Sequence, residues 1–69
     1  MQDNVFKMSL RAARLNAKIS SMEKAANLIG VHKDTIRNWE IGKSIPRADQ
    51  VPAIEKAYKI PYDNIDFTN

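Results

Sequence analysis

The 69-residue sequence lacks cysteine and contains one histidine, two glycines and five aromatic residues. The absence of cysteine excludes disulfide bonds, thiolate zinc sites and cysteine nucleophiles. The single histidine, His32, cannot form a histidine metal cluster or a paired-histidine catalytic site. Because Gly30 and Gly42 are the only glycines, a glycine-rich phosphate-binding loop is also excluded. We therefore expect no metal, no cofactor and no enzymatic activity.

Long apolar runs are absent as well, since no stretch approaches the ~20 residues of a membrane-spanning helix. The N-terminal residues Met1–Asn4 are polar and lack the apolar stretch of a signal peptide. These features predict a cytoplasmic protein that does not associate with membranes. The short length, with 43% apolar and 28% charged residues, is typical of one small globular domain over residues 1–69.

The net charge of +3 is unevenly distributed along the chain. Residues 1–47 carry nine basic and four acidic residues, whereas residues 48–69 carry two lysines and four acidic residues. A basic first part of the chain followed by an acidic last part suits a polyanionic partner such as nucleic acid. An ordinary solvated surface gives such asymmetry more often, so charge alone does not decide between the two.

Helical periodicity and capping residues predict a compact all-α fold of five short helices, and no alternating run indicates a β-hairpin. Ser9 is the expected cap of the first helix, which extends to about Lys18. Either Ser20 or Ser21 caps the second helix, which ends at Gly30. The apolar stripes comprise Leu10, Ala13, Leu15 and Ala17 on the first helix and Met22, Ala25, Ala26 and Ile29 on the second.

The two helices predicted beyond the third are marked by proline as well as by periodicity. Asp49 is the expected cap of the fourth helix, and Pro52 lies in its first turn, where the missing N–H costs little. Pro61 opens a last short turn from Tyr62 to Ile65, counted as the fifth helix, which buries Ile65, with Phe67 as a further candidate. The expected inward face of the fourth helix comprises Val51, Ile54, Ala57 and Tyr58.

Residues 22–41 have the spacing of a helix-turn-helix, in which two short helices meet through a turn that contains a glycine. His32 is the expected cap of the second of these helices, and Ile36 and Trp39 are its inward residues. We interpret Trp39 as a core residue and not as a stacking platform. Val31 and Ile36 form a candidate hydrophobic staple. A generic helical hairpin shares these features, so the outward face of this helix decides the interpretation.

That outward face carries Lys33, Asp34, Arg37 and Asn38, and none of them is apolar. Lys33 and Arg37 are like charges four positions apart, an arrangement that a nearby anion would favour. Arginine and asparagine match the edges of guanine and adenine in the major groove. Asp34 can accept a hydrogen bond from cytosine or complement the helix dipole, and the second role is favoured. The face therefore predicts double-stranded DNA as the partner.

In these residues the sequence resembles the Cro/repressor-type (XRE-type, lambda-repressor-like) helix-turn-helix proteins, especially small prophage-type members. The resemblance implies a five-helix DNA-binding domain whose third helix enters the major groove. It also implies a transcriptional repressor that binds a near-palindromic operator as a weak homodimer. The resemblance runs from about Leu10 to Ile65 and rests on residues 25–31, 35–43 and 56–63, together with Pro46.

The same resemblance implies roles for individual residues. Lys33, Asp34 and Asn38 match base-facing positions, with Arg37 beside them. Arg14 and Glu40 match a structural ion pair that joins the first and third helices. The expected phosphate contacts are His32, Thr35, Lys43, Ser44 and Arg47.

The sequence departs from the family pattern at several positions. Met22 or Ser21 stands where the family often has a phosphate-contacting glutamine, and Lys59 stands where a helix-ending glycine is common. The turn between the first two helices is one residue longer than usual, and Pro52 is unusual.

The alternative function is a protein-interaction module on the same scaffold, such as an antitoxin or adaptor. Such a module needs an exposed apolar patch. The only candidate in the sequence is the region of Tyr62, Ile65 and Phe67, which is also the expected dimer surface.

Overall fold

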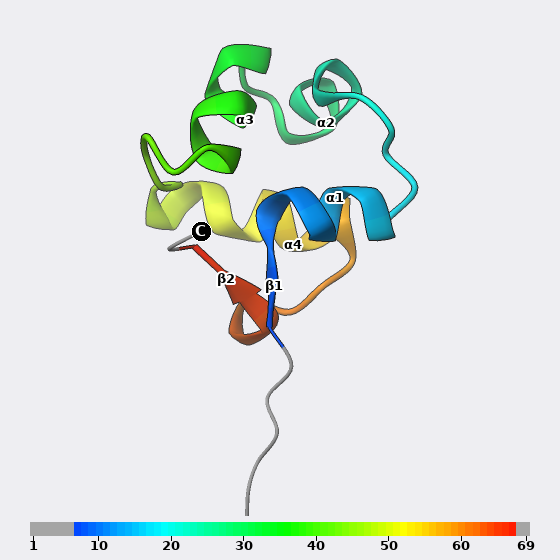
Figure 1. Ribbon diagram of the computed structural model, residues 1–69, viewed down its shortest axis with the longest axis vertical. Helices are drawn as coiled ribbons and strands as arrows, with labels where there is room; N and C mark the ends of the chain where they lie inside the picture. Colours follow the sequence, from blue (N-terminus) through cyan, green and yellow to red (C-terminus); the bar gives the residue numbers. More distant parts are fainter. Residues whose placement is uncertain (1–6, 68–69) are drawn as a thin grey trace, which may run out of the picture.

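The computed structural model describes residues 7–67, and in this range the chain forms four α-helices, two short 3₁₀ turns and one pair of very short strands. In Figure 1, α2 and α3 lie on one side of α1 and α4, and the strand pair lies on the other side. The elements are β1 (Met8–Ser9), α1 (Leu10–Asn16), α2 (Met22–Ile29), α3 (Lys33–Glu40), a 3₁₀ turn (Ala48–Gln50), α4 (Val51–Tyr58), a second 3₁₀ turn (Tyr62–Asn64) and β2 (Ile65–Asp66).

The prediction of a mostly helical fold is confirmed, but the expected number of five helices is wrong. The segment after Pro61 forms a 3₁₀ turn of three residues, closed by the N–H of Asn64 donating to the Pro61 carbonyl at 2.9 Å. It does not continue as a helix because Ile65 already has extended backbone angles, with φ −106° and ψ 130°. The chain needs this extended geometry to pair with β1.

The pairing of β1 with β2 was not expected from the sequence. The strands are parallel, with Met8 opposite Ile65 and Ser9 opposite Asp66. Two residues per strand are too few to show the alternation by which strands are recognised in a sequence. The pair fixes Ile65 in the core, where only 3% of its surface is exposed.

Polar side chains begin each of the first three helices. The Ser9 hydroxyl accepts from the Ala12 N–H at 3.1 Å, as predicted. For α2 the cap is Ser21 and not Ser20, since the Ser21 hydroxyl accepts from the Lys24 N–H at 3.1 Å. These bonds satisfy backbone donors that the first turn of a helix leaves without partners.

The start of α4 differs from the prediction. Asp49 does not cap this helix, which begins at Val51, and it lies instead in the preceding 3₁₀ turn. The side chain of Gln50 closes that turn by accepting from the Arg47 N–H at 2.8 Å. The prediction for Pro52 is confirmed, because it lies in the first turn of α4.

The core forms where the four helices and β2 meet. Leu15, predicted as part of the apolar stripe of α1, is 44% exposed, and α1 ends at Asn16 before reaching Lys18. The inward residues predicted for α2 and α3 are buried or packed against the core, as are Ile54, Ala57 and Tyr58 of α4. Val51, also predicted to face inward, is half-buried and lines a surface groove instead. The buried apolar residues are Leu10, Ala13, Ile19, Ala25, Ala26, Ile36, Trp39, Ile54, Tyr58 and Ile65.

Two lysines adopt the left-handed backbone conformation that favours glycine. Lys18 follows α1 with φ 67°, and Lys59 ends α4 with φ 55°. A side chain with a Cβ is strained in this conformation by about 1–2 kcal/mol. Lys59 therefore ends α4 in the left-handed conformation that a glycine would adopt without strain.

Among residues 7–67, no helix has the length and apolar character needed to cross a membrane.

Candidate nucleic-acid interface

The joint between α2 and α3 depends on the backbone of Gly30. This residue has φ 90°, and both its N–H and that of Val31 donate to the Ala26 carbonyl, at 2.7 and 3.0 Å. A Cβ built on Gly30 would meet no atom within 4 Å. Glycine is needed here for its backbone conformation and not to avoid crowding. The tight turn fixes α3 relative to α2.

The inward face of α3 anchors it to the core. Ile36 is fully buried and Trp39 is 4% exposed, in agreement with the interpretation of both as core residues. Because successive residues rotate by about 100° around a helix, this anchoring sets which side chains face outward. The outward side chains are Lys33, Asp34 and Arg37, all exposed, and Asn38, which is half-buried.

His32 caps α3, as predicted. Its Nδ1 accepts from the Asp34 N–H at 3.0 Å, and the Asp34 carboxylate lies 3.7 Å from the same nitrogen. A neutral histidine that accepts at Nδ1 carries its proton on Nε2, so this side chain retains a donor for an anion. About 70% of each of the two side chains is exposed. Asp34 in the first turn complements the helix dipole, and its exposure also leaves it free to contact a base.

The loop after α3 is tied to the end of that helix. The Asn38 carbonyl accepts from the N–H of Lys43 at 2.9 Å and from that of Ser44 at 3.3 Å. Both loop side chains are exposed. This loop is therefore held next to the outward face of α3. Thr35 is half-buried, and its N–H donates to the His32 carbonyl at 2.9 Å.

Arg47 lies further along this loop and has a partner within the chain. Its Nε donates to Asp49 Oδ1 at 3.1 Å, and both side chains are more than 70% exposed. The hydrogen bond from Arg47 lowers the pKa of the Asp49 carboxyl. This pair was not predicted from the sequence, because Asp49 was expected to cap a helix. The two-residue spacing of the arginine and the aspartate was the signal that could have identified it.

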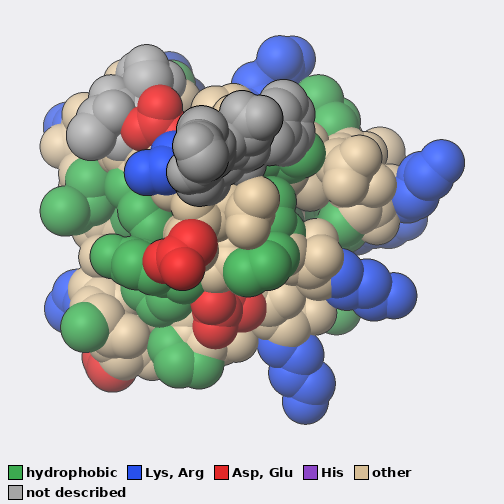
Figure 2. Space-filling model, turned by 90° about the horizontal axis from the view of Figure 1, so that it is seen from below, with side chains coloured by type: hydrophobic (Ala, Val, Ile, Leu, Met, Phe, Trp, Pro, Cys, Tyr) green, Lys and Arg blue, Asp and Glu red, His purple; other side chains and the backbone are tan. Residues whose placement is uncertain are grey.

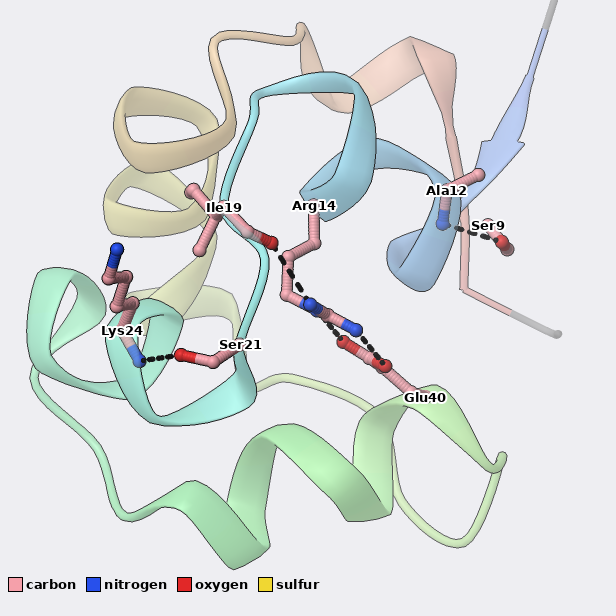
Figure 3. Close-up of polar contacts among 7 residues, drawn as sticks. All are labelled: Ser9, Ala12, Arg14, Ile19, Ser21, Lys24 and Glu40. Carbon is pink, nitrogen blue, oxygen red and sulfur yellow. Dashed lines mark hydrogen bonds and ion pairs between the residues drawn. The ribbon is translucent and has the colours of Figure 1, made fainter.

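Arg14 and Glu40 connect α1 to α3 (Figure 3). Arg14 Nε donates to Glu40 Oε2 at 2.7 Å and a second guanidinium nitrogen donates to Oε1 at 3.3 Å, while the third donates to the Ile19 carbonyl at 3.0 Å. The side chains are 5% and 3% exposed. The hydrogen bond to Glu40 raises the pKa of Arg14 further, against the opposing effect of burial. This bidentate geometry is that of a strong, buried ion pair.

Tyr58 of α4 is buried close enough to this pair to sense its charges. Only 1% of the residue is exposed, and burial raises the pKa of its hydroxyl to about 12. The negative charge of Glu40 contributes to this increase in the pKa, whereas the charge of Arg14 opposes it. The ion pair therefore joins α1 to α3, and its charges also act on the buried hydroxyl of Tyr58 in α4.

The start of α2 lacks the amide side chain that the family pattern has there. Met22 is the first residue of α2 and packs against the core, and the Ser21 hydroxyl is used as the cap. In the family pattern a glutamine side chain at this place contacts a phosphate and braces the recognition helix, and neither Met22 nor Ser21 can do both. This end of α2 therefore presents backbone N–H groups and a serine hydroxyl in place of a glutamine.

Basic side chains surround the outward face of α3. Figure 2 views the molecule from the side opposite α3, where acidic side chains lie near the centre of the face and most Lys and Arg side chains project at the right edge, with a few at the left. The surface of α3 and the loop after it carries Lys33, Arg37, Lys43 and Arg47. Within residues 7–67, no group of three or more His, Asp and Glu side chains could hold a metal ion.

A family model described as helix-turn-helix matches residues 10–65, most of the chain. The chain therefore belongs to the XRE-type helix-turn-helix family. Members of this family are DNA-binding transcription regulators and not a class of enzymes, and this protein is a DNA-binding regulator of that type. Searches of curated proteins and of solved structures give no match to this chain.

Proposed function

We propose that this protein is a prophage-type transcriptional repressor that binds a near-palindromic operator as a pair of protomers. In this proposal α3 lies in the major groove of each half-site. Half-sites contacted by the two protomers are then separated by one helical turn of DNA, about 10–10.5 base pairs, or by a multiple of it.

The observation that carries the proposal is the polar outward face of a helix whose opposite face is buried. Four polar side chains of α3 face outward, while Ile36 and Trp39 hold the helix in place. A rigid helix with such a face suits the major groove, which admits an α-helix and displays hydrogen-bonding base edges. Sites on helices also hold their side chains more accurately than sites on loops do.

We assign base contacts to Lys33, Asp34, Arg37 and Asn38 and phosphate contacts to residues around them. Phosphate contacts set register and affinity, whereas base contacts set sequence preference. Arg47 uses only its Nε for Asp49, so its other guanidinium nitrogens can still donate to a phosphate, and an exposed pair of this kind is also weak enough to open. The phosphate contacts comprise His32, Thr35, Lys43, Ser44 and Arg47.

The proposal is tested by comparing Asn38→Ala with Lys43→Ala. Both substitutions keep the backbone bond from Lys43 to the Asn38 carbonyl, so the loop should keep its position in either variant. A preferred duplex is first selected from random sequences, and each variant is then titrated on this duplex and on a scrambled one at two salt concentrations.

We expect Asn38→Ala to lose about 1–3 kcal/mol on the preferred duplex and to relax preference at one base pair. Lys43→Ala should weaken both duplexes by a similar factor and reduce the slope of log K against log salt by about one. If Asn38→Ala weakens both duplexes equally and Lys43→Ala erases discrimination, the assignment of the recognition face is wrong.

We further propose that protomers associate through an apolar groove beside the loop that follows α3. Ile45 and Tyr62 are 65% and 51% exposed there, and the Tyr62 ring lies 5.4 Å from that of Phe67. Ile65, named in the sequence analysis as part of this surface, is buried in the core and does not contribute to it. The groove is lined by Ile45, Pro46, Ala48, Val51, Tyr62 and Phe67.

Self-association through this groove is tested with Ile45→Ser, because this exposed side chain contributes little to the core. Sedimentation should show a weak dimer of the parent protein at high concentration and a monomer of the variant. The variant should also lose cooperative binding to a two-half-site duplex while it still binds one half-site. Unchanged dimerisation in Ile45→Ser would place the dimer contact elsewhere.

A further inference from the structure

A second apolar hollow lies among the ends of α1, α2 and α4. Its apolar lining consists of Ala17, Ile19, Leu28, Ala53 and Ala57. Leu28 lies outside the inward stripe of α2 and is 61% exposed. The volume is about 590 Å³, within the range of sites that accept large side chains or ligands. We refer to it below as the α2–α4 hollow.

The charged residues that line the α2–α4 hollow are Lys56 and Lys59. Two more lysines adjoin it along the chain. Lys18 lies between the lining residues Ala17 and Ile19, and Lys24 precedes Leu28 by one helical turn on the same side of α2. Figure 3 shows the Lys24 side chain extending from α2 away from α3. The hollow therefore combines an apolar floor with a lysine rim.

The acidic residues nearest in sequence, Glu23 and Glu55, are not among the lining residues of the α2–α4 hollow. Glu23 lies beside the joint of α2 and α3, where it lines a hollow with Asn27 and His32. Glu55 accepts from the Tyr62 N–H on the side of α4 that meets the C-terminal segment. The lysine rim is therefore not neutralised by these acids, and its charge is complementary to an acidic partner.

DNA does not account for this combination as well as a protein does. A phosphate backbone would use the lysines but would leave the exposed Leu28 and the alanine floor without a function. An amphipathic helix that carries acidic residues beside its apolar face would use both parts of the surface. Arranged in this way, the lysines would steer the approach and the apolar floor would supply the contact area.

We propose that the α2–α4 hollow binds an acidic amphipathic helix of a protein partner. This inference is independent of DNA recognition by α3, since the side chains involved belong to different surfaces. It assigns to the protein a further binding site, distinct from the DNA-binding face and from the groove proposed for self-association, through which another protein can act on a DNA-bound regulator.

The test is a competitive selection with the purified protein. The probe is a displayed library of helical peptides of about 16 residues, long enough to form a helix on binding. The apolar face is fixed as leucine at helical spacing, and the flanking positions vary among Glu, Gln and Lys. We expect acidic peptides to be enriched. Methyl NMR signals of Leu28 and amide signals of Ala53 and Ala57 should shift when the selected peptide is added.

Three variants separate this site from the DNA interface. Leu28→Ser and Lys56→Glu should each weaken the selected peptide at least about tenfold while they leave DNA affinity within about twofold. Lys59→Gly removes a rim charge and relieves a strained backbone, so a loss of peptide affinity in this variant cannot be attributed to unfolding. Lys43→Ala is the matched control, which should weaken DNA and leave peptide affinity unchanged.

Several outcomes would overturn the proposal. They include enrichment of neutral or basic peptides, the absence of any binder, and equal binding to the parent and Leu28→Ser proteins. If Leu28→Ser abolishes self-association in sedimentation experiments, the occupant is a second copy of this chain. If Lys56→Glu lowers the salt slope of DNA binding as much as Lys43→Ala does, the lysine rim contacts DNA. Failure of DNA binding with intact peptide binding would overturn only the proposed function.

Discussion

Two arginine–carboxylate pairs in this protein have similar chemistry and very different surroundings. Arg14 and Glu40 meet at 2.7 Å, with side chains that are 5% and 3% exposed. Arg47 and Asp49 meet at 3.1 Å, with side chains that are 73% and 72% exposed. The residues of the first pair are 26 positions apart in the sequence and lie on different helices. The residues of the second pair are two positions apart within one segment.

Burial, and not the presence of an ion pair, decides what each arginine can do. A buried pair is costly to break because the remaining charge has no water to solvate it. An exposed pair contributes little, about 0–1 kcal/mol, because water and salt solvate and screen its charges. Arg14 is thus committed to positioning α3, while Arg47 can exchange its partner for a phosphate.

The largest expected effect is that of Glu40→Ala. Removing this carboxylate leaves Arg14 charged and buried, with the Ile19 carbonyl as its remaining acceptor among the bonds described above. Loss of one partner from a buried pair costs about 3–5 kcal/mol, a large part of the stability of a domain this small. Urea denaturation followed by circular dichroism measures the change. A variant with unchanged stability would show that the pair contributes nothing to folding.

A double substitution tests whether the unpaired Arg14 causes this loss of stability. Replacing both partners with apolar residues of similar size, as in Arg14→Met with Glu40→Leu, removes the stranded charge as well as the pair. We expect the double variant to be more stable than Glu40→Ala alone. If the two are equally unstable, the loss comes from packing around α3 and not from an unpaired arginine.

The second expected effect is alkaline destabilisation through Tyr58. Burial raises the pKa of this hydroxyl to about 12, above the ordinary value of 10.0, so the folded state favours the neutral form. The resulting stability is fully present below pH 10.0 and is lost as the pH rises through about 12. A shift of this size corresponds to about 1–3 kcal/mol.

Tyrosinate absorbance and denaturation between pH 9 and 12 measure this effect, with Tyr62→Phe protein used to isolate the signal of Tyr58. In Tyr58→Phe protein the loss of stability over this range should be smaller than in the parent. If the two proteins lose stability in parallel, another group is responsible for the alkaline transition.

The smallest effect on stability is expected for Asp49→Ala. Because the pair is exposed, the free energy of unfolding should stay nearly unchanged. Arg47 would then be released, so DNA affinity should rise and the slope of log K against log salt should steepen. Titration at several salt concentrations tests this, with Arg47→Ala as the control. A large loss of stability in Asp49→Ala would contradict the contrast between the two pairs.

Local signals in the sequence predicted the helix-turn-helix well. Ser9, His32 and Gly30 act where they were expected, because a cap or a left-handed turn depends on a few neighbouring residues. The prediction for Asp49 was wrong because its local sequence is compatible with more than one arrangement. An aspartate before a helix has several acceptable partners, and nothing local shows that Arg47 and Gln50 compete for the turn.

Features formed between distant segments were not predictable in the same way. The Arg14–Glu40 pair was expected only through resemblance to a family, since no local pattern links positions so far apart. The lysine rim combines Lys18 and Lys24 with Lys56 and Lys59. The last two belong to residues 48–69, which are acidic as a whole, so the distribution of charge along the chain gave no sign of this rim. Packing of α2 against α4 brings these residues together, and this could not be inferred from composition.

The parallel pairing of β1 with β2 has a consequence for the order in which the protein folds. Met8 and Ile65 are 57 positions apart, so their contact closes a loop that contains all four helices. Such closure is entropically costly until the intervening chain is compact, whereas the α2–α3 joint forms between neighbours. We therefore expect the helix-turn-helix to assemble first and the strands to join last. During folding, the amide protons of the segment that carries Ile65 and Phe67 would then be the last to become protected from solvent. When the domain opens, they would be the first to exchange with solvent.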